Sequence, residues 1–344
     1  MTEQAVIIGA GQAGAQAAQS LRQAGFAGRI VMIGAEAHLP YQRPPLSKAY
    51  LKGELDADRL LLRPAAFFER EKVEILLSTR VLEIDRKAGR VIWVGGDIAY
   101  DRLLLSTGAP PRRLICPGND LDGVHYLRTI GDSDRLRPML HSAGRLAVIG
   151  AGYIGLEVAA AARAAGKDVT VLEAAPRVLA RVAPPALSAV YEDAHRRAGV
   201  DLRLGAEASC IEGRGRVEAV VLKSGDRIPC TDVLIGIGAA PETALAVAAG
   251  LDVANGVVVD EAARSSDPQI FAAGDMTNFP SPLYGRRVRL ESVPNAIDQA
   301  KAAAAAMAGR EAVYNSVPWF WSDQYDLKLQ TAGLGEGADA TVLR

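Results

Sequence analysis

The chain has 344 residues, of which 49% are hydrophobic and 23% charged, and its formal net charge at pH 7 is -1. This is the composition of an ordinary globular protein, long enough for two or three domains with buried cores. The small net charge gives no electrostatic reason to bind nucleic acid or an anionic membrane, so we expect neither as a partner. No apolar run is long enough to span a bilayer, and a first strand at Ala5 leaves no room for a signal peptide. We therefore expect a cytoplasmic protein.

The cysteines and histidines show no metal-binding or redox pattern. The chain has three cysteines and four histidines, all isolated in sequence, and no C-x-x-C. This spacing favours free thiols in a reducing compartment and gives no zinc-ligand pattern. We expect no metal site.

The chain opens with a dinucleotide-binding fingerprint. An apolar strand from Ala5 leads into Gly9, Gly11 and Gly14, followed by a helix at 15–23 and a strand at 29–33. The glycines allow a tight turn, close approach of a pyrophosphate and close helix–strand packing. Ala35 stands where an acid for the ribose is usual. Glu36 either reaches round to do this work or is a solvated surface residue, and both interpretations stay open.

A proline-rich turn follows at 40–48. Its Pro-Pro pair stiffens the chain, and Ser47 is a plausible N-cap of a short helix. Lys48 is either a solvated surface lysine or a positive charge presented beside a flavin ring.

Short apolar runs at 73–76, 81–84, 91–94 and 103–105 predict a β-meander that covers the first unit. The last run ends in small residues and prolines at 106–111, a linker pattern in which Gly108 also permits close approach of a ligand. We place the crossover into a second domain here.

The second fingerprint runs from Val148 to Glu173 and follows a helix predicted at 133–140. An apolar strand, the glycines Gly150, Gly152 and Gly155, an Ala-rich helix and a second strand closed by Glu173 come in the required order. Two fingerprints in one chain indicate two bound dinucleotides, and the usual pair is a flavin and a nicotinamide.

The rest of the chain contains the return to the first domain. A helix is predicted at 186–198, and the run 236–241 repeats the strand–glycine–proline pattern of the first crossover. A buried strand at 270–274 ends in Asp275. This residue could cap a helix or accept a hydrogen bond from the ribityl chain of a flavin, and the two roles can coexist. A helix is predicted at 296–307.

Two clusters remain. The cluster 318–324 contains two of the three tryptophans, and either packs in a core or places an indole against a flavin edge. Arg286, Arg287 and Arg289 form a basic cluster that is more often a solvated loop.

Together these patterns predict an α/β fold with two Rossmann-like dinucleotide-binding domains, for FAD and NAD, the second inserted in the first, and a short C-terminal α+β segment. We place the FAD-binding domain at 1–110 and 237–315, the NAD-binding domain at 111–236 and a truncated C-terminal domain at 316–344.

At this point the sequence resembles the NAD(P)H-dependent ferredoxin and rubredoxin reductases that serve bacterial oxygenases. These enzymes are similar in fold to glutathione reductase but lack its redox disulfide, in agreement with the absence of C-x-x-C. The stretches that carry the resemblance are Gly9 to Gly14, Arg43 to Lys48, Gly150 to Glu157, Ala272 to Asp275, Glu291 to Ala296 and Pro318 to Gln324.

The resemblance implies roles for individual residues. Lys48 lies near the flavin and pairs with Glu157, and these two are the candidate catalytic residues. The positions implied to hold FAD are Gly9, Gly11, Ala13, Gly14, Glu36, Arg43, Lys48, Val81, Thr107, Gly108, Arg128, Gly274, Asp275, Val293 and Trp321. Those implied to hold the nicotinamide dinucleotide are Gly150, Gly152, Ile154, Gly155, Glu157, Glu173 and Gly238.

The expected activity is transfer of electrons from NADH through FAD to a 2Fe–2S ferredoxin, or a rubredoxin, that feeds a haem mono-oxygenase or a dioxygenase. Glu173 favours NADH because a carboxylate accepts the ribose 2′-hydroxyl and repels a 2′-phosphate, although Arg177 nearby could soften this. The docking charges for an acidic ferredoxin would be Arg286, Arg287, Arg289 and Lys301.

Two alternatives are a flavin reductase of a small molecule and a redox-sensing flavoprotein resembling the apoptosis-inducing factors. Two features depart from the family. Ala35 replaces the usual acid, and the chain stops at Arg344, before the family's C-terminal domain normally ends.

Overall fold

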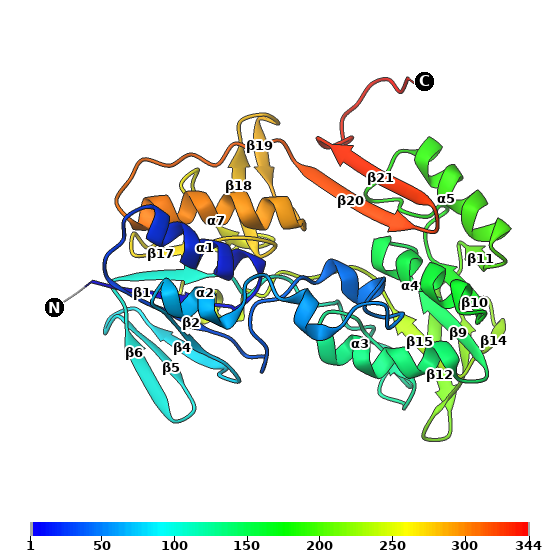
Figure 1. Cartoon of the computed structure of the whole chain (residues 1–344). Helices are drawn as coiled ribbons and strands as arrows, with labels where there is room; N and C mark the ends of the chain where they lie inside the picture. Colours follow the sequence, from blue (N-terminus) through cyan, green and yellow to red (C-terminus); the bar gives the residue numbers. More distant parts are fainter. Residues whose placement is uncertain (1–2, 343–344) are drawn as a thin grey trace. The chain divides into compact units, whose positions relative to one another are not determined.

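The computed structural model describes residues 3–342, which form two compact units, each built from separate pieces of the chain (Figure 1). Unit 1 contains the N-terminal residues to Gln42, Leu60–Pro110 and Ala240–Phe320, and unit 2 contains Arg43–Arg59, Pro111–Ala239 and the chain from Trp321. The main body of unit 2 is thus inserted in unit 1. Residues 43–59 group with unit 2, whereas the sequence-based division kept them in the first domain.

The core of unit 1 is a parallel five-stranded sheet in the order β17-β7-β1-β2-β3. Its strands are β1 (Gln4–Ile8), β2 (Arg29–Ile33), β3 (Val73–Leu76), β7 (Arg102–Leu105) and β17 (Ile270–Ala272). The first predicted strand–helix–strand unit is therefore confirmed.

The β-meander predicted over 73–105 is wrong at its two ends, because β3 and β7 are strands of this parallel sheet. Leu103, Leu104 and Leu105 are completely buried, as is typical of a parallel strand covered on both faces. A short apolar run of this kind looks the same in a meander and in a parallel sheet. Only the middle of the predicted segment, β4 (Val81–Asp85), β5 (Arg90–Trp93) and β6 (Gly96–Ala99), forms an antiparallel sheet.

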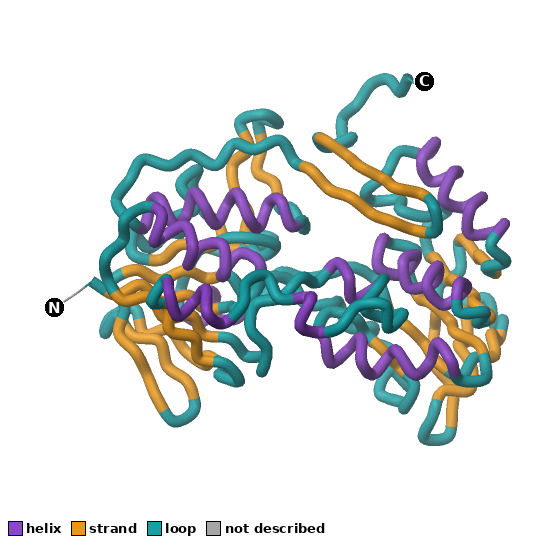
Figure 2. Tube along the Cα trace, in the orientation of Figure 1, coloured by secondary structure: helices purple, strands orange, loops and turns teal. Residues whose placement is uncertain are grey.

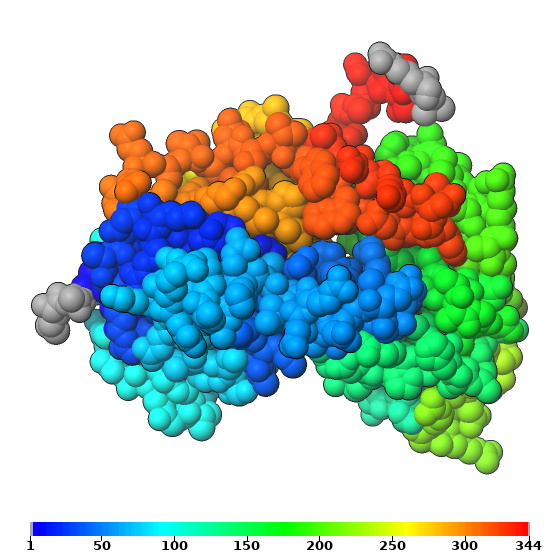
Figure 3. All heavy atoms as spheres, in the orientation of Figure 1, coloured from blue at the N-terminus to red at the C-terminus, as the bar shows by residue number. Residues whose placement is uncertain are grey.

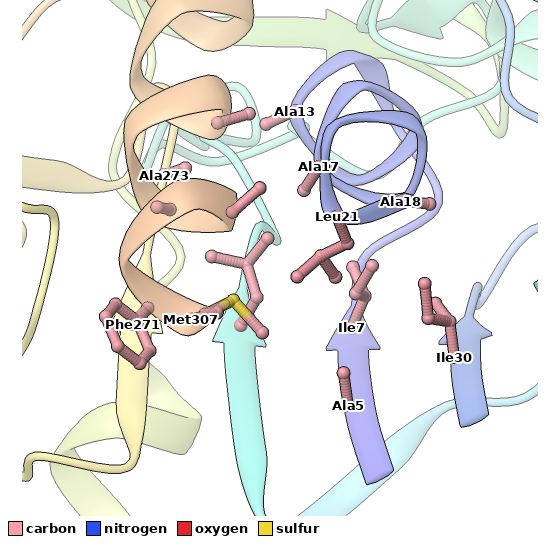
Figure 4. Packing of buried hydrophobic residues seen from close by; sticks show 14 of the residues in the cluster. Ala5, Ile7, Ala13, Ala17, Ala18, Leu21, Ile30, Phe271, Ala273 and Met307 are labelled. Atoms are coloured by element: carbon pink, nitrogen blue, oxygen red, sulfur yellow. The ribbon is translucent and has the colours of Figure 1, made fainter. Parts of the chain in front are cut away.

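Two Ala-rich helices, α1 (Gln12–Gln23) and α7 (Val293–Met307), pack against each other beside this sheet. Figure 4 shows Ala13, Ala17 and Leu21 of α1 on the side that faces the second helix, with Ile7 of β1 below. The small alanine side chains allow the two helices to approach closely. Helix α7 begins earlier than the predicted Ala296, because the Ser292 side chain caps it by accepting a hydrogen bond from the Asn295 amide at 3.2 Å.

The remaining elements of unit 1 are short. They are a sheet of β16 (Val257–Val258), β18 (Thr277–Ser281) and β19 (Arg286–Val288), with helices α2 (Ala65–Arg70) and α6 (Ala244–Ala248). A 3-10 turn, Ala57–Leu60, includes the last residues of the segment 43–59 of unit 2 and the first residue of the next segment of unit 1.

Unit 2 repeats the same design. Its parallel sheet has the order β11-β10-β9-β15-β8, and Figure 2 shows its strands with helices alongside. The strands are β8 (Val124–His125), β9 (Arg145–Ile149), β10 (Asp168–Glu173), β11 (Asp201–Leu204) and β15 (Asp232–Ile235). An antiparallel sheet of β12 (Ala208–Gly213), β13 (Val217–Leu222) and β14 (Arg227–Pro229) adds to it. The predicted class, α/β with two Rossmann-like domains and one inserted in the other, is confirmed.

The helices of unit 2 are α3 (Ile130–Leu136), α4 (Tyr153–Ala164) and α5 (Pro185–Arg197), with 3-10 turns at Pro44–Ser47 and Arg137–His141. The helix predicted at 133–140 starts and ends earlier than expected. Thr129 and Asp132 form a capping box at its start, and Pro138 sits at the beginning of the 3-10 turn that follows.

The C-terminal segment is a hairpin of β20 (Trp319–Gln324) and β21 (Leu327–Ala332). Within residues 316–342 the structure has no helix, so the α+β character predicted for this segment is wrong for the described residues, which contain strands alone. In Figure 3 the hairpin lies at the surface beside the green atoms of unit 2. His195 on α5 is completely buried and makes two hydrogen bonds with the hairpin. Its Nε2 lies 2.9 Å from Gln324 Oε1, and its Nδ1 lies 3.1 Å from Tyr325 Oη.

No helix among the described residues 3–342 is long and apolar enough to cross a membrane.

The buried His195 leads to a prediction about pH. Burial lowers the pKa of His195 below its ordinary value, so the folded protein holds the neutral ring while the unfolded chain takes up a proton near pH 6.5. The unfolded state then binds more protons, and stability falls as the pH drops below about 6.5. We expect the melting temperature to fall over this range, and His195→Gln to flatten the fall. The control His141→Gln removes an exposed histidine and should leave it unchanged; equal pH dependence in both variants would contradict the assignment.

Candidate functional site

In unit 1 several of the predicted FAD residues follow strands at the carboxyl edge of the parallel sheet. Gly9 follows β1, Glu36 lies beyond β2, Thr107 follows β7 and Gly274 follows β17. Strand β1 lies between β7 and β2, so the glycine turn that follows it is at the point where the strand order reverses. Ligands of open α/β sheets bind at this place.

The three glycines of the first turn have different surroundings. Gly9 has φ +115°, and a Cβ there would lie 2.3 Å from the Ser106 carbonyl oxygen. A Cβ on Gly14 would lie 2.0 Å from the Gly9 carbonyl oxygen, whereas a Cβ on Gly11 would have no atom within 4 Å. Packing within the protein therefore requires the outer glycines, and the middle one faces open space at the start of α1.

Glu36 lies near this turn. A Cβ on Gly34 would lie 2.7 Å from Ala10 Cβ, so the loop after β2 touches the glycine turn. The Glu36 carboxylate accepts a hydrogen bond from the Tyr41 hydroxyl at 2.5 Å. Glu36 is half-buried and oriented by this bond, which disfavours the interpretation as a fully solvated residue.

The turn after β17 brings further predicted residues to the same place. A Cβ added to Gly274 would lie 3.4 Å from Ala13 Cβ on α1 and 3.8 Å from Ala296 Cβ on α7, which is ordinary van der Waals contact. Its amide donates to Gln299 Oε1 at 2.8 Å. Asp275 is not a helix cap, because β18 and no helix follows it. Val293 is the first residue of α7, and Val81 is buried on β4.

In unit 2 the second glycine turn repeats this geometry. Gly150 has φ +101°, and a Cβ there would lie 2.5 Å from the Gly236 carbonyl oxygen. A Cβ on Gly155 would lie 2.2 Å from the Gly150 carbonyl oxygen, but one on Gly152 would have a single neighbour, at 3.9 Å. Ile154 is 46% exposed at the start of α4.

The acid at the end of β10 is held by the backbone of this turn. Glu173 Oε2 accepts from the Ala151 amide at 2.6 Å, and Oε1 accepts from the Ala175 amide at 2.8 Å. Arg177, which the sequence offered as a modifier of Glu173, instead donates to the Ala180 and Ala183 carbonyls of its own loop and to the Ser188 hydroxyl on α5. Exposed Arg181 lies beside Gly238, where an added Cβ would meet its Nη2 at 2.6 Å.

The predicted catalytic pair is formed in unit 2. Glu157, on α4 and 6% exposed, lies 2.6 Å from Lys48 Nζ through Oε2. The Ser47 hydroxyl donates to the same oxygen at 2.5 Å, and the Ser322 hydroxyl of β20 donates to Oε1 at 2.7 Å. Ser47 is therefore not a helix N-cap: it ends a 3-10 turn, and its hydroxyl binds the buried carboxylate.

Three further predicted FAD residues lie in unit 2, namely Arg43, Arg128 and Trp321. Arg43 donates to the Arg128 carbonyl at 2.6 Å, which joins the start of the 43–59 segment to the residue before the cap of α3. Trp321 is half-buried and Trp319 is 38% exposed, so the interpretation of the 318–324 cluster as a buried aromatic core is wrong. The structure leaves the roles of these residues as predictions.

The basic cluster is partly neutralised inside unit 1. Arg287 donates to the carbonyls of Val259 and Asn278. Arg289 is paired with Glu291 at 2.6 Å, and Lys301 with Asp298 at 2.8 Å. Among the described residues no group of three or more His, Cys, Asp or Glu could hold a metal ion.

Sequence reasoning missed the residues that support these turns. Ser106 donates to the Ile8 and Gly9 carbonyls at 3.0 Å, and Gln299 holds Gly274. Ser322 binds Glu157 from 165 positions away. No local pattern marks a serine or glutamine whose partner is so distant in sequence.

The chain matches two family models: pyridine nucleotide-disulphide oxidoreductase over residues 3–300 and reductase C-terminal over residues 319–344. It is 49% identical over 341 residues to the rhodocoxin reductase of Rhodococcus erythropolis, covering 98% of this chain and 80% of that protein. It is 44% identical over 346 residues to the putidaredoxin reductase CamA of Pseudomonas putida, covering 98% and 82%.

Solved structures agree. The ferredoxin reductase for the CYP199A2 system from Rhodopseudomonas palustris superposes with a TM-score of 0.97 at 47% identity, covering 99% of this chain and 85% of that one. The covalent putidaredoxin reductase–putidaredoxin complex gives a TM-score of 0.95 at 44% identity, covering 98% and 83%.

The different surroundings of the glycines can be tested by stability. Gly14→Ala forces a Cβ against backbone, and overpacking of this kind costs about 1–3 kcal/mol. Gly11→Ala, whose Cβ meets open space, loses only the small advantage of glycine at a helix N-cap. We expect thermal melting followed by circular dichroism to show a clear loss for Gly14→Ala and little for Gly11→Ala. The pair Gly155→Ala and Gly152→Ala should repeat this in unit 2, and equal losses within either pair would refute the distinction.

Proposed function

Because the chain belongs to the pyridine nucleotide-disulphide oxidoreductase family, we propose that it is an FAD-dependent reductase. In this proposal it passes electrons from NADH to a 2Fe–2S ferredoxin, or a rubredoxin, that serves a haem mono-oxygenase or a dioxygenase. The observation that supports it most is the repeated glycine turn. In each unit the outer glycines are required by packing, while the middle glycine has space for a ligand against the helix N-terminus.

These turns fit the pyrophosphates of two dinucleotides. A helix N-terminus offers unpaired amides and the positive end of a dipole, and the bare backbone at Gly11 or Gly152 allows a phosphate to approach. The turn at Gly9 would hold FAD, with Glu36 as acceptor for its ribose and Asp275 for its ribityl chain. The turn at Gly150 would hold the nicotinamide dinucleotide. When bound, the flavin accepts an electron pair from the nicotinamide and releases electrons singly.

Glu173 supports NADH as the coenzyme. Its two oxygens are each held by one backbone amide, and a carboxylate keeps further lone pairs that can accept from a ribose diol. A 2′-phosphate would face this fixed negative charge. Arg177 does not compensate for it, because its guanidinium is bound to the Ala180 and Ala183 carbonyls and to the Ser188 hydroxyl.

Lys48 and Glu157 have complementary roles in the proposal. The Lys48 ammonium supplies positive charge for the flavin ring, and the buried Glu157 orients it. No nucleophile is needed, since this catalysis is mostly positioning and electrostatics.

The proposed partner rests on the relatives. The similar proteins are named as reductases of rhodocoxin, putidaredoxin and rubredoxin, and one solved relative is in covalent complex with putidaredoxin. An acidic ferredoxin would meet the remaining basic surface of unit 1, where Arg286 is exposed, and the association would weaken with salt.

Coenzyme choice gives a direct test of the function. Mixed anaerobically in a stopped-flow instrument, the purified protein should lose its flavin absorbance quickly with NADH and much more slowly with NADPH. Failure of both coenzymes to bleach the flavin would refute the reductase assignment.

The role of Glu173 has its own variant. Glu173→Gln removes the charge but keeps an amide oxygen, and hydrogen bonds to charged groups are the stronger ones, so we expect the KM for NADH to rise about tenfold. The preference over NADPH should shrink. Glu192→Gln is the matched control, because Glu192 also accepts from a backbone amide, that of Val178, in the same unit. Steady-state kinetics with both coenzymes measure the effect, and an unchanged preference in Glu173→Gln would assign the choice to other residues.

The flavin turn has a parallel test. Gly11→Ala should fold but retain less flavin after purification, as measured by the ratio of visible to ultraviolet absorbance, because its methyl group occupies the space that the pyrophosphate needs. Full flavin content in this variant would place the cofactor elsewhere.

A further inference from the structure

A continuous chain of buried polar side chains runs through unit 2 from α5 to Glu157. His195, Gln324 and Ser322 are 0%, 2% and 0% exposed, and Glu157 itself is 6% exposed. Each neighbouring pair along the chain is within hydrogen-bond distance. Buried polar groups of this kind are costly unless every member is satisfied, so a complete network fixes the geometry of its members.

The partners determine the direction of every hydrogen bond. The Ser322 hydroxyl donates to Glu157 Oε1 at 2.7 Å and therefore accepts from Gln324 Nε2 at 3.2 Å. With its amide nitrogen used in this way, Gln324 turns its oxygen to His195 Nε2 at 2.9 Å, which must carry the hydrogen. His195 Nδ1 then accepts from the Tyr325 hydroxyl at 3.1 Å. All the donors point along the chain toward the carboxylate.

This chain reaches the carboxylate on the side opposite to Lys48. Lys48 and Ser47 both contact Oε2, whereas Ser322 is bonded to Oε1. Without Ser322, the Glu157 carboxylate would be held from one side only and could rotate about its side-chain torsion. The ammonium of Lys48 would then lose a fixed partner position.

We infer that Ser322 is a positioning residue for the Glu157–Lys48 pair, and that Gln324 and His195 orient its hydroxyl. The inference rests on the proposed function, because it assigns a consequence for the rate of flavin reduction. The same strand alternation that turns Ser322 and Gln324 inward turns Trp321 and Asp323 to the other face of β20. The C-terminal hairpin thus contributes to the catalytic pair through a side chain that need not touch coenzyme or flavin.

The test separates rate from coenzyme affinity. In Ser322→Ala the charge-assisted hydrogen bond to Glu157 is lost, and we expect the limiting rate of flavin reduction at saturating NADH to fall about tenfold. The KM for NADH should change less than twofold, because the glycine turn and Glu173 are untouched. Ser322→Thr keeps the hydroxyl on a strand and should restore most of the rate. Anaerobic stopped-flow at a series of NADH concentrations measures both quantities.

Ser188→Ala is the matched control. Ser188 is a serine of the same unit, 1% exposed, with its hydroxyl bonded to Val178 and Arg177 and no contact with Glu157. It should keep the wild-type limiting rate. If Ser322→Ala does not fold, Gln324→Met removes the donor to Ser322 at similar side-chain volume and should lower the rate by a smaller factor.

The outcomes divide clearly. A low limiting rate in Ser322→Ala, rescue by Ser322→Thr and a normal Ser188→Ala support the inference. Three results would overturn the inference while leaving the reductase function intact. One is a wild-type rate in Ser322→Ala or, if that variant does not fold, in Gln324→Met. The others are an effect on KM alone and an equally low rate in Ser322→Thr. A wild-type protein that NADH does not reduce would overturn the proposed function, and this inference with it.

Discussion

The rest of unit 2 depends on one set of interactions, the ion pair and hydrogen bonds that hold the buried carboxylate of Glu157. A charge removed from water is very costly unless it is paired and hydrogen-bonded. Here the ammonium of Lys48 and the hydroxyls of Ser47 and Ser322 all bind it. Because these groups come from a 3-10 turn, from helix α4 and from strand β20, one charge holds together three segments that are far apart in sequence. The helix involved is also the one that begins at the second glycine turn.

The two glycine turns satisfy a different constraint, and both units meet it in the same way. A strand must pass directly into a helix while the backbone remains accessible from outside. The first glycine lies against the carbonyl after a neighbouring strand, Ser106 in unit 1 and Gly236 in unit 2, and the third lies against the first. At the middle position an added Cβ would meet no atom within 4 Å in unit 1, and in unit 2 only the Gly236 carbonyl oxygen, at 3.9 Å. This arrangement combines close packing with an accessible phosphate-sized surface, and it explains why the spacing of the three glycines is so informative.

The sequence alone predicted those features whose causes are local. Each strand–glycine–helix–strand unit is marked by a pattern within one short stretch of the chain, and the structure confirms both units. The role of Glu173 stays a prediction. The Lys48–Glu157 pair came from the family resemblance and from no pattern in the chain itself. The strand at Leu103–Leu105 was assigned to the wrong sheet because an apolar run does not reveal its partners. The sequence predicts a helix cap at Ser47, because its partner Glu157 is 110 positions away and no local pattern marks it.

The inserted topology has a consequence for the order in which the chain can fold as it is synthesised. The sheet of unit 2 is complete at β15, before β17 and α7 of unit 1 have been made. Unit 1 must therefore wait with an open sheet edge at β7 while the inserted unit forms. The hairpin comes last of all, so Glu157 lacks its third donor until the end of the chain docks. A nascent chain is thus a form of this protein in which the charged pair exists before it is held in place.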